Sequence, residues 1–161
     1  MRKIDKIIVH CTATDNRSNN RIKDLIEFHK GSPLKKFWWG GKWVPGRGFR
    51  NIGYHKYIDP QGVLHNGRDV ETIGAHCEGE NAHSIGVCLG GLNDFRPIQF
   101  QTLKAVIINL CATFTLNPLT DVYPHNYFNP NKSCPNFDLR EWLEKEFTNG
   151  ADTGSGTEGK I

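Results

Sequence analysis

The sequence of 161 residues has no long apolar run. No stretch approaches the roughly 18 consecutive apolar residues that cross a bilayer, which excludes a protein with membrane-spanning helices. The first apolar stretch, Ile4–Val9, is interrupted by charge and is too short for the core of a secretory signal. We therefore expect synthesis in the cytoplasm without a signal peptide, and no membrane insertion.

Cysteine occurs in an odd number and without the spacing of a metal finger. There is no CxxC pair, and the spacing is not that of a small disulfide scaffold. We expect reduced thiols, at least one of which has a chemical role. Three of them are interpreted as small buried thiols, namely Cys11, Cys88 and Cys111. The sequence leaves the position of Cys77 open, exposed or buried, and Cys134 is considered below.

Acidic residues are scarce at the start of the chain. Residues 1–50 hold 12 Lys and Arg but only four Asp and Glu, although the whole chain carries a net charge of only +3. A basic surface attracts nucleic acid, anionic lipid or another acidic polymer. No helix-turn-helix or zinc-finger spacing is present, so nucleic acid is the weaker of these partner hypotheses.

Apolar periodicity predicts alternating strands and helices. Strands are expected over 4–10, 54–59, 63–68 and 84–89, and helices over 21–30, 98–115 and 139–147. Residues 31–53 hold six Gly and no acidic residue, which favours a long loop or a loop with a small hairpin. The pattern predicts a single α/β domain over residues 1–148, with a mixed central sheet flanked by helices. Residues 149–161 are expected to form a flexible tail.

Two segments bring together residues that can bind a metal. His10 ends the first strand, and the Pro-rich segment after residue 116 holds His125, Lys132 and Cys134. Two His and one Cys would leave the fourth position of a tetrahedral zinc ion to water, as in catalytic sites. Lys132 could stabilise a developing oxyanion. The alternative is a structural His and a surface loop with an incidental thiol.

Tyr54 and His55 compete for a place at the same site. Side chains alternate across a strand, so only one of the two can face the metal. Tyr54 offers a phenol that can donate to an oxyanion, and His55 is the rival third ligand. The residues alone leave both possibilities open.

Several motifs occur together in one order. They are Ile8-Val9-His10-Cys11-Thr12-Ala13-Thr14, Gly53-Tyr54-His55, Gly67-Arg68-Asp69, Gly74-Ala75-His76, Ser84-Ile85-Gly86-Val87-Cys88-Leu89-Gly90-Gly91 and Lys132-Ser133-Cys134-Pro135-Asn136-Phe137-Asp138-Leu139. On these motifs the chain resembles the zinc-dependent N-acetylmuramoyl-L-alanine amidases of the type-2 family, above all their short phage members. Animal peptidoglycan recognition proteins share that fold. The resemblance covers residues 4–147.

The resemblance implies a role for each matching residue. It makes His10, His125 and Cys134 the ligands of one zinc ion at an edge of the sheet, and Tyr54 and Lys132 the catalytic residues. His76 falls where relatives line the substrate groove, and Arg68 is a further substrate-binding candidate. The implied reaction is hydrolysis, by zinc-activated water, of the amide between N-acetylmuramic acid and L-alanine of peptidoglycan. We expect a monomeric endolysin that reaches the cell wall after holin-type release, secretion-system delivery or lysis.

The aromatic and basic segment at about 31–50 is an insert relative to those phage members. Trp38 and Trp39 are candidates to stack on sugar rings, and its cations to meet carboxylates of the wall. The alternative is a loop whose tryptophans fold against the domain.

Other relatives bind peptidoglycan without cleaving it, or serve as antibacterial effectors. Some phage members also restrain an RNA polymerase through a longer leader. Because His10 is preceded by only nine residues, that partner is the weaker hypothesis.

Overall fold

The computed structural model describes residues 2–14 and 21–148. A five-stranded sheet with the order β5-β4-β6-β1-β7 forms its centre. Its strands are β1 (Lys6–Cys11), β4 (Lys56–Ile58), β5 (Leu64–Asn66), β6 (Ser84–Leu89) and β7 (Val122–Pro124). β4, β6, β1 and β7 are parallel neighbours, and β5 pairs antiparallel with β4. This mixed sheet confirms the predicted fold class.

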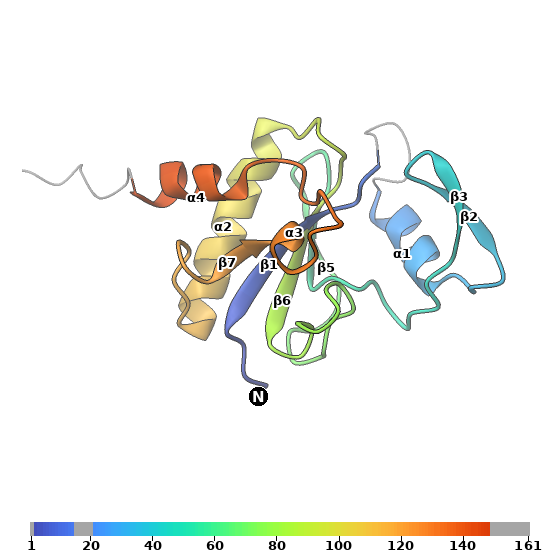
Figure 1. Ribbon diagram of the computed structural model, residues 1–161, viewed down its shortest axis with the longest axis horizontal. Helices are drawn as coiled ribbons and strands as arrows, with labels where there is room; N and C mark the ends of the chain where they lie inside the picture. Colours follow the sequence, from blue (N-terminus) through green and yellow to red (C-terminus); the bar gives the residue numbers. More distant parts are fainter. Residues whose placement is uncertain (1, 15–20, 149–161) are drawn as a thin grey trace, which may run out of the picture.

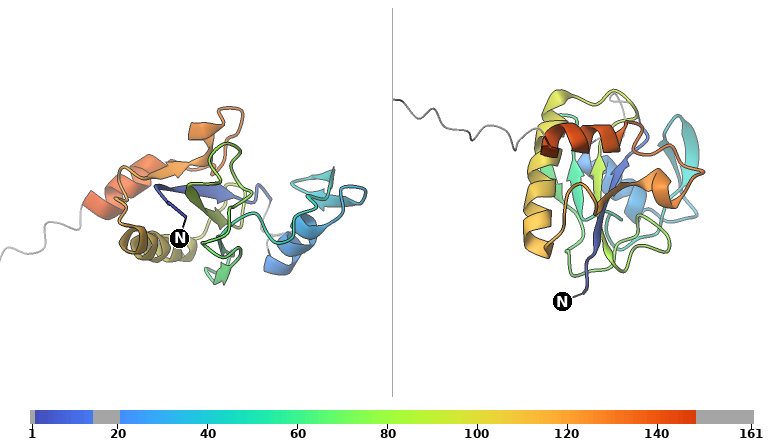
Figure 2. Two further views of the ribbon diagram at one scale, coloured as in Figure 1. Left: turned by 90° about the horizontal axis from the view of Figure 1, so that it is seen from below. Right: turned by 60° about the vertical axis from the view of Figure 1, so that its left-hand side comes forward.

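Helices cover both faces of the sheet (Figures 1 and 2). The helices are α1 (Ile22–Lys30), α2 (Pro97–Phe114), α3 (His125–Phe128) and α4 (Leu139–Thr148). α2 and α4 lie on one face, and α1 lies on the other beside a separate hairpin of β2 (Lys36–Trp39) and β3 (Lys42–Pro45). Within the described ranges, none of these helices is both long and apolar enough to cross a membrane.

The alternation of side chains along β1 divides its residues between two environments. Ile7 and Val9 are fully buried in the main core, which also contains Leu103 and Ile107 of α2. His10, at the next position, faces the opposite side. Burying each large aliphatic side chain stabilises the fold by about 1.5–3 kcal/mol. The apolar half of the strand therefore fixes the direction in which His10 points.

Local contacts define where α2 and α4 begin. Pro97 is the first residue of α2, where its missing N–H costs nothing, and the Gln99 side chain accepts a hydrogen bond from the backbone of Arg96. At α4, Asp138 accepts a hydrogen bond from the Glu141 backbone N–H, as an N-cap does. The helix predicted over 139–147 is thus confirmed, with Asp138 at its start.

Several predicted boundaries need correction. The strands predicted over 54–59 and 63–68 are shorter, Lys56–Ile58 and Leu64–Asn66. The Pro-rich segment after residue 116, for which no strand or helix was predicted before residue 139, contains β7 and α3; the three residues of β7 form a strand by pairing with β1, and a run this short carries no alternating pattern. The position of Cys77, which the sequence left open, is buried. The predicted tail, 149–161, lies outside the described residues.

Candidate active site

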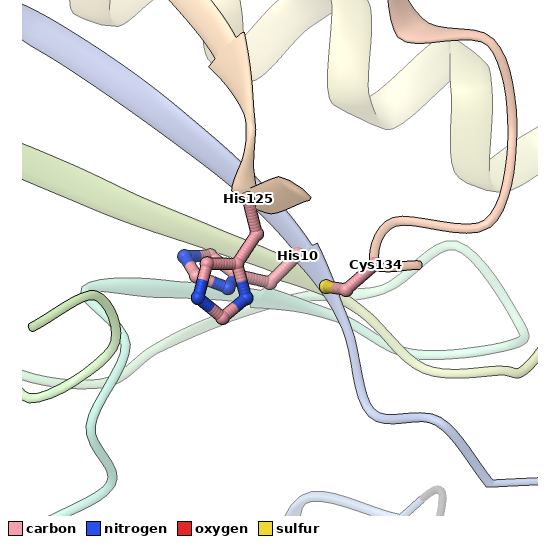
Figure 3. A group of neighbouring side chains, drawn as sticks. All are labelled: His10, His125 and Cys134. Carbon is pink, nitrogen blue, oxygen red and sulfur yellow. The ribbon is translucent and has the colours of Figure 1, made fainter. Parts of the chain in front are cut away.

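Three side chains from distant parts of the chain converge where β1 ends. They are His10 of β1, His125 at the start of α3, and Cys134 in the segment before α4 (Figure 3). Their potential ligand atoms all lie within 4.8 Å of one another. The ring centroids of the two histidines are 4.4 Å apart. The structure therefore brings together the three residues that the sequence singled out as metal ligands.

The backbone positions each of the three. β7 pairs with β1 in the register Val9 to Pro124, so the residue after Pro124, His125, meets the end of β1. The backbone N–H of Asn126 donates to the carbonyl of Cys134 (3.0 Å), which holds the C-terminal segment against α3. The backbone N–H of Cys11 donates to the Cys134 sulfur at 3.1 Å.

The protonation of the cluster suits a metal. Burial and the neighbouring His76 and His125 rings hold the pKa of His10 well below its usual value, so the ring is neutral and can offer a lone pair. A hydrogen bond with the Cys11 thiol and burial raise the pKa of Cys134. Its sulfur is therefore a thiol until a cation displaces the proton, which a zinc ion does on coordination.

The donor set fits zinc. Ligands at tetrahedral positions around one zinc ion lie about 3.5 Å apart, so a cluster within 4.8 Å needs only small side-chain movements. Two imidazole nitrogens and one sulfur bind zinc in preference to magnesium or calcium, which prefer oxygen ligands. The Cys11 N–H, directed at the Cys134 sulfur, would stabilise the thiolate.

His76 lies beside the cluster and contacts His10 directly. Its Nδ1 is 3.0 Å from His10 Nε2, and its Nε2 is 3.4 Å from the Ser84 hydroxyl, which donates to the Glu80 carbonyl. The Asn81 side chain accepts a hydrogen bond from the His76 backbone N–H. A residue expected to line the substrate groove is thus held by three polar partners, one of which is a candidate ligand.

Two glycines that lie against the His76 ring explain its position. A Cβ on Gly86 of β6 would lie 2.6 Å from the His76 ring, and a Cβ on Gly74 would lie 2.5 Å from it. The ring can lie flat against the strand only because both side chains are absent. Gly86 therefore serves the site, although the sequence shows it only as part of a buried strand.

The contacts of Tyr54 and His55, rather than strand alternation, decide which of them faces the cluster, because both residues lie before β4. The Tyr54 ring lies 5.2 Å from the His10 ring, and burial raises the pKa of its hydroxyl, so it stays a proton donor. His55 accepts a hydrogen bond from the Gly86 backbone N–H on Nδ1 and faces the Thr72 carbonyl with Nε2. Both nitrogens of His55 are occupied, and it is not in the cluster.

A pocket of about 740 Å³ opens over the cluster. Its lining includes the three candidate ligands, Tyr54, His76, Lys132 and, from the insert, Trp39, Gly40, Lys42, Val44, Arg47 and Phe49. The insert thus forms part of the pocket wall. Trp38 and Arg68 do not line it. The Arg68 guanidinium donates to the carbonyls of Ile52 and Ile73 and stacks over Phe49, so its contacts are structural.

Two residues of the site were not predicted from the sequence. Cys11 appeared to be only a buried thiol, yet its backbone contacts Cys134; its place beside His10 was the available signal. His29 falls within the helix predicted over 21–30 and shares the spacing of its apolar residues, yet it lines the pocket and accepts a hydrogen bond from the Gly53 N–H. Helical periodicity cannot distinguish a buried His that faces the core from one that faces a pocket.

Comparison with known proteins identifies the family. Residues 1–137 match the family described as N-acetylmuramoyl-L-alanine amidase. The chain belongs to this family. The endolysin of Escherichia phage T7 is 34% identical over 158 residues, covering 93% of this chain and 92% of that protein. The endolysin of Enterobacteria phage T3 is 33% identical, covering 93% and 92%.

A solved structure of the family has the same fold. The N-acetylmuramoyl-L-alanine amidase LysC from Clostridium intestinale URNW superposes with a TM-score of 0.67 at 25% identity, covering 91% of this chain and 87% of that one. The resemblance to an amidase of the endolysin type, and with it the expected α/β fold and enzyme class, is thereby confirmed for this member of the amidase family.

Proposed function

We propose that this amidase uses one zinc ion to hydrolyse the amide between the lactyl group of N-acetylmuramic acid and L-alanine of the peptidoglycan stem peptide. The observation that carries the proposal is the His10, His125 and Cys134 cluster in the wall of an open pocket. Three protein ligands leave one tetrahedral position for water or substrate. A four-ligand structural site would leave none.

The chemistry divides between the metal and the chain. A zinc ion there would lower the pKa of bound water to about 7 and polarise the carbonyl under attack. Lys132 lies on the pocket wall, two residues before Cys134, and its ammonium would stabilise negative charge on the former carbonyl oxygen. The protonated Tyr54 hydroxyl would donate to the same oxygen or pass a proton.

The bond changes are those of amide hydrolysis. The oxygen of water bonds to the lactyl carbonyl carbon, and the bond from that carbon to the alanine nitrogen breaks. The nitrogen gains a proton and leaves as the amino group of the peptide. The glycan keeps a lactyl carboxylate where the amide was, so each cleavage adds one negative charge to the glycan strand.

The charge around the pocket fits an acidic substrate. Lys42, Arg47 and Lys132 line the pocket, and Glu78 is the acidic residue in its lining. Lys42 and Arg47 both belong to the insert, so the insert would meet carboxylates of the stem peptide. Trp39 remains a candidate for substrate contact, and His76 is better explained as the residue that orients His10.

A peptidoglycan-binding protein without activity is the second candidate. Relatives of that kind typically lack the cysteine ligand, whereas this chain has both Cys134 and Lys132. Endolysin-type similarity supports a lytic role, exercised once the enzyme reaches the wall. An antibacterial effector would use the same chemistry and differ only in its delivery.

Product analysis tests the proposal. The zinc-loaded protein should release N-terminal alanine from purified sacculi without new reducing sugar, and a chelator should stop the release until zinc is restored. New reducing ends would mean that a glycosidic bond is cut. Binding to sacculi without any release would favour the non-catalytic alternative.

A further inference from the structure

The β2–β3 hairpin has two faces of different character. In the register of the pair, Trp38 lies opposite Trp43, and Phe37 lies opposite Val44. Phe37 and Trp39 point to one side, where Trp39 stacks on Phe28 of α1 at 4.4 Å. The Trp39 indole N–H also donates to the Thr12 carbonyl (3.0 Å). This inner face holds the hairpin on the domain, so the outer face is not needed for that purpose.

The outer face carries Lys36, Trp38, Trp43 and Pro45, and we call it the outer platform. Trp38 is 46% exposed and Trp43 is 64% exposed. The two indoles meet edge to face, with centroids 5.6 Å apart and planes at 69°. A pair of large aromatic side chains left in water on a secured hairpin marks an interaction surface.

The chemistry of the outer platform selects among partners. Indole faces present their π-electrons to C–H groups of pyranose rings, the usual way in which tryptophan binds sugars. Between Gly31 and Gly53 there are five cations, namely Lys35, Lys36, Lys42, Arg47 and Arg50, and no acidic residue. Of these five, Lys36 lies on the outer platform itself, whereas Lys42 belongs to the inner face of the hairpin. Two indoles beside a lysine, on a segment without carboxylates, fit a sugar polymer that is also an anion.

The reaction itself makes such a polymer. An intact stem peptide occupies the lactyl group as a neutral amide, and hydrolysis replaces the amide by a carboxylate. The same hairpin also reaches the pocket, where Trp39, Lys42 and Val44 of its inner face contribute to the lining. In Figure 1 the hairpin forms the end of the molecule opposite α4.

We propose that the outer platform binds the glycan strand from which stem peptides have already been removed. This inference rests on the proposed function, because only an amidase creates that strand. Binding its own product would keep the enzyme on the wall between cleavages. An anionic membrane surface would also attract tryptophan and lysine, but it offers no reason for a platform built on the strands of the pocket.

The test is binding of the zinc-loaded full chain to purified, peptide-free glycan strands, measured by isothermal titration calorimetry, which does not depend on tryptophan emission. The double variant Trp38→Ala/Trp43→Ala should bind at least tenfold more weakly. Trp38→Phe/Trp43→Phe, which keeps two rings, should lose less than threefold. Ile108→Ala, at an exposed position of α2, is the matched control and should bind like the parent chain. Chitohexaose, which lacks carboxylates, should bind at least fivefold more weakly than glycan strands of similar length.

Three outcomes would overturn the inference. One is equal binding of the strands by the double alanine variant and the parent chain. Another is equal affinity of the parent chain for chitohexaose and the strands. The third is that the double variant loses binding to phosphatidylglycerol vesicles and keeps its binding to strands, which would make the platform a membrane contact. Failure of the proposed function is read separately, as absence of alanine release from sacculi by the parent chain.

A second readout separates the outer platform from the pocket. In the double alanine variant, the loss of alanine release should be at least fivefold larger on sacculi than on a soluble disaccharide muropeptide. An equal loss on both substrates would mean that the two tryptophans act on the pocket or on folding, and it would contradict the proposal.

Discussion

Nε2 of His10 and Nδ1 of His76 lie 3.0 Å apart, and this contact determines which nitrogen of each ring carries the proton. With Nε2 engaged, Nδ1 of His10 is the nitrogen left for a metal. A neutral His10 bound through Nδ1 carries its proton on Nε2 and donates it to His76. His76 then carries its own proton on Nε2, toward the Ser84 hydroxyl. The donors and acceptors are consistent along the whole chain of contacts.

The first prediction concerns this contact. His76→Ala should weaken zinc binding about 10- to 100-fold, because a ligand that loses its hydrogen-bonded neighbour loses orientation and basicity. His76→Gln, whose amide can still accept, should recover part of the loss. Competition with a chromogenic chelator measures the affinity. His83→Ala is the control, since His83 is exposed and contacts the Lys3 carbonyl. Unchanged zinc affinity in His76→Ala would remove the positioning role.

The second prediction concerns Gly86. Gly86→Ala should destabilise the fold by about 1–3 kcal/mol, because the new methyl group would overlap the His76 ring. The same substitution should cost clearly less in a His76→Ala background, where the ring is gone. Urea unfolding of the four chains gives the coupling energy. Additive effects would show that Gly86 is needed for another reason.

The third prediction separates ligand from helper. Cys134→Ser should lose zinc, whereas Lys132→Ala should keep one zinc ion per chain and lower kcat about 100-fold, as removal of an oxyanion donor does. Metal analysis and alanine release are measured on the same samples. Lys145→Ala, on the exposed side of α4, is the charge-matched control. Loss of zinc from Lys132→Ala would contradict the assigned role.

The fourth prediction concerns acid. Burial, with the charges of Arg47 and Arg68, lowers the pKa of His29 to about 4, below the usual 6.5 of an unfolded chain. Between these values the unfolded chain binds more protons, so stability is full above about pH 6.5 and falls as the pH drops toward 4. Relative to pH 7, His29 therefore lowers the free energy of unfolding at pH 4.5 by about 2–3 kcal/mol.

Urea unfolding at pH 7 and pH 4.5 measures that loss. His55, whose pKa is also lowered to about 4 by burial, adds to the total in every variant. The comparison is therefore with His29→Gln, which has no proton to gain. Its stability should fall by about 2–3 kcal/mol less between the two pH values. Equal losses in both chains would mean that His29 keeps an ordinary pKa in the fold.

The insert shows what sequence reasoning leaves open. Its tryptophans were expected either to meet substrate or to fold against the domain, and the hairpin divides them between its faces. Trp39 packs on Phe28, and Trp38 faces outward. The positive φ angles of Gly40 and Gly41 form the turn that sets this register. Composition suggested a small hairpin; the pairing decided which ring goes where.

The sequence by itself determined the family, the α/β class and the identity of the three candidate ligands. These depend on residue type and order: apolar periodicity along strands and helices, and His or Cys at the ends of recognisable motifs. Tertiary structure alone decided the rest. Only the packing of β7 against β1 brings His125 to His10, only the bare surface of Gly86 admits His76, and only the contacts of Arg68 turn it away from the pocket. Such relations join residues far apart in the chain, where no local spacing can record them.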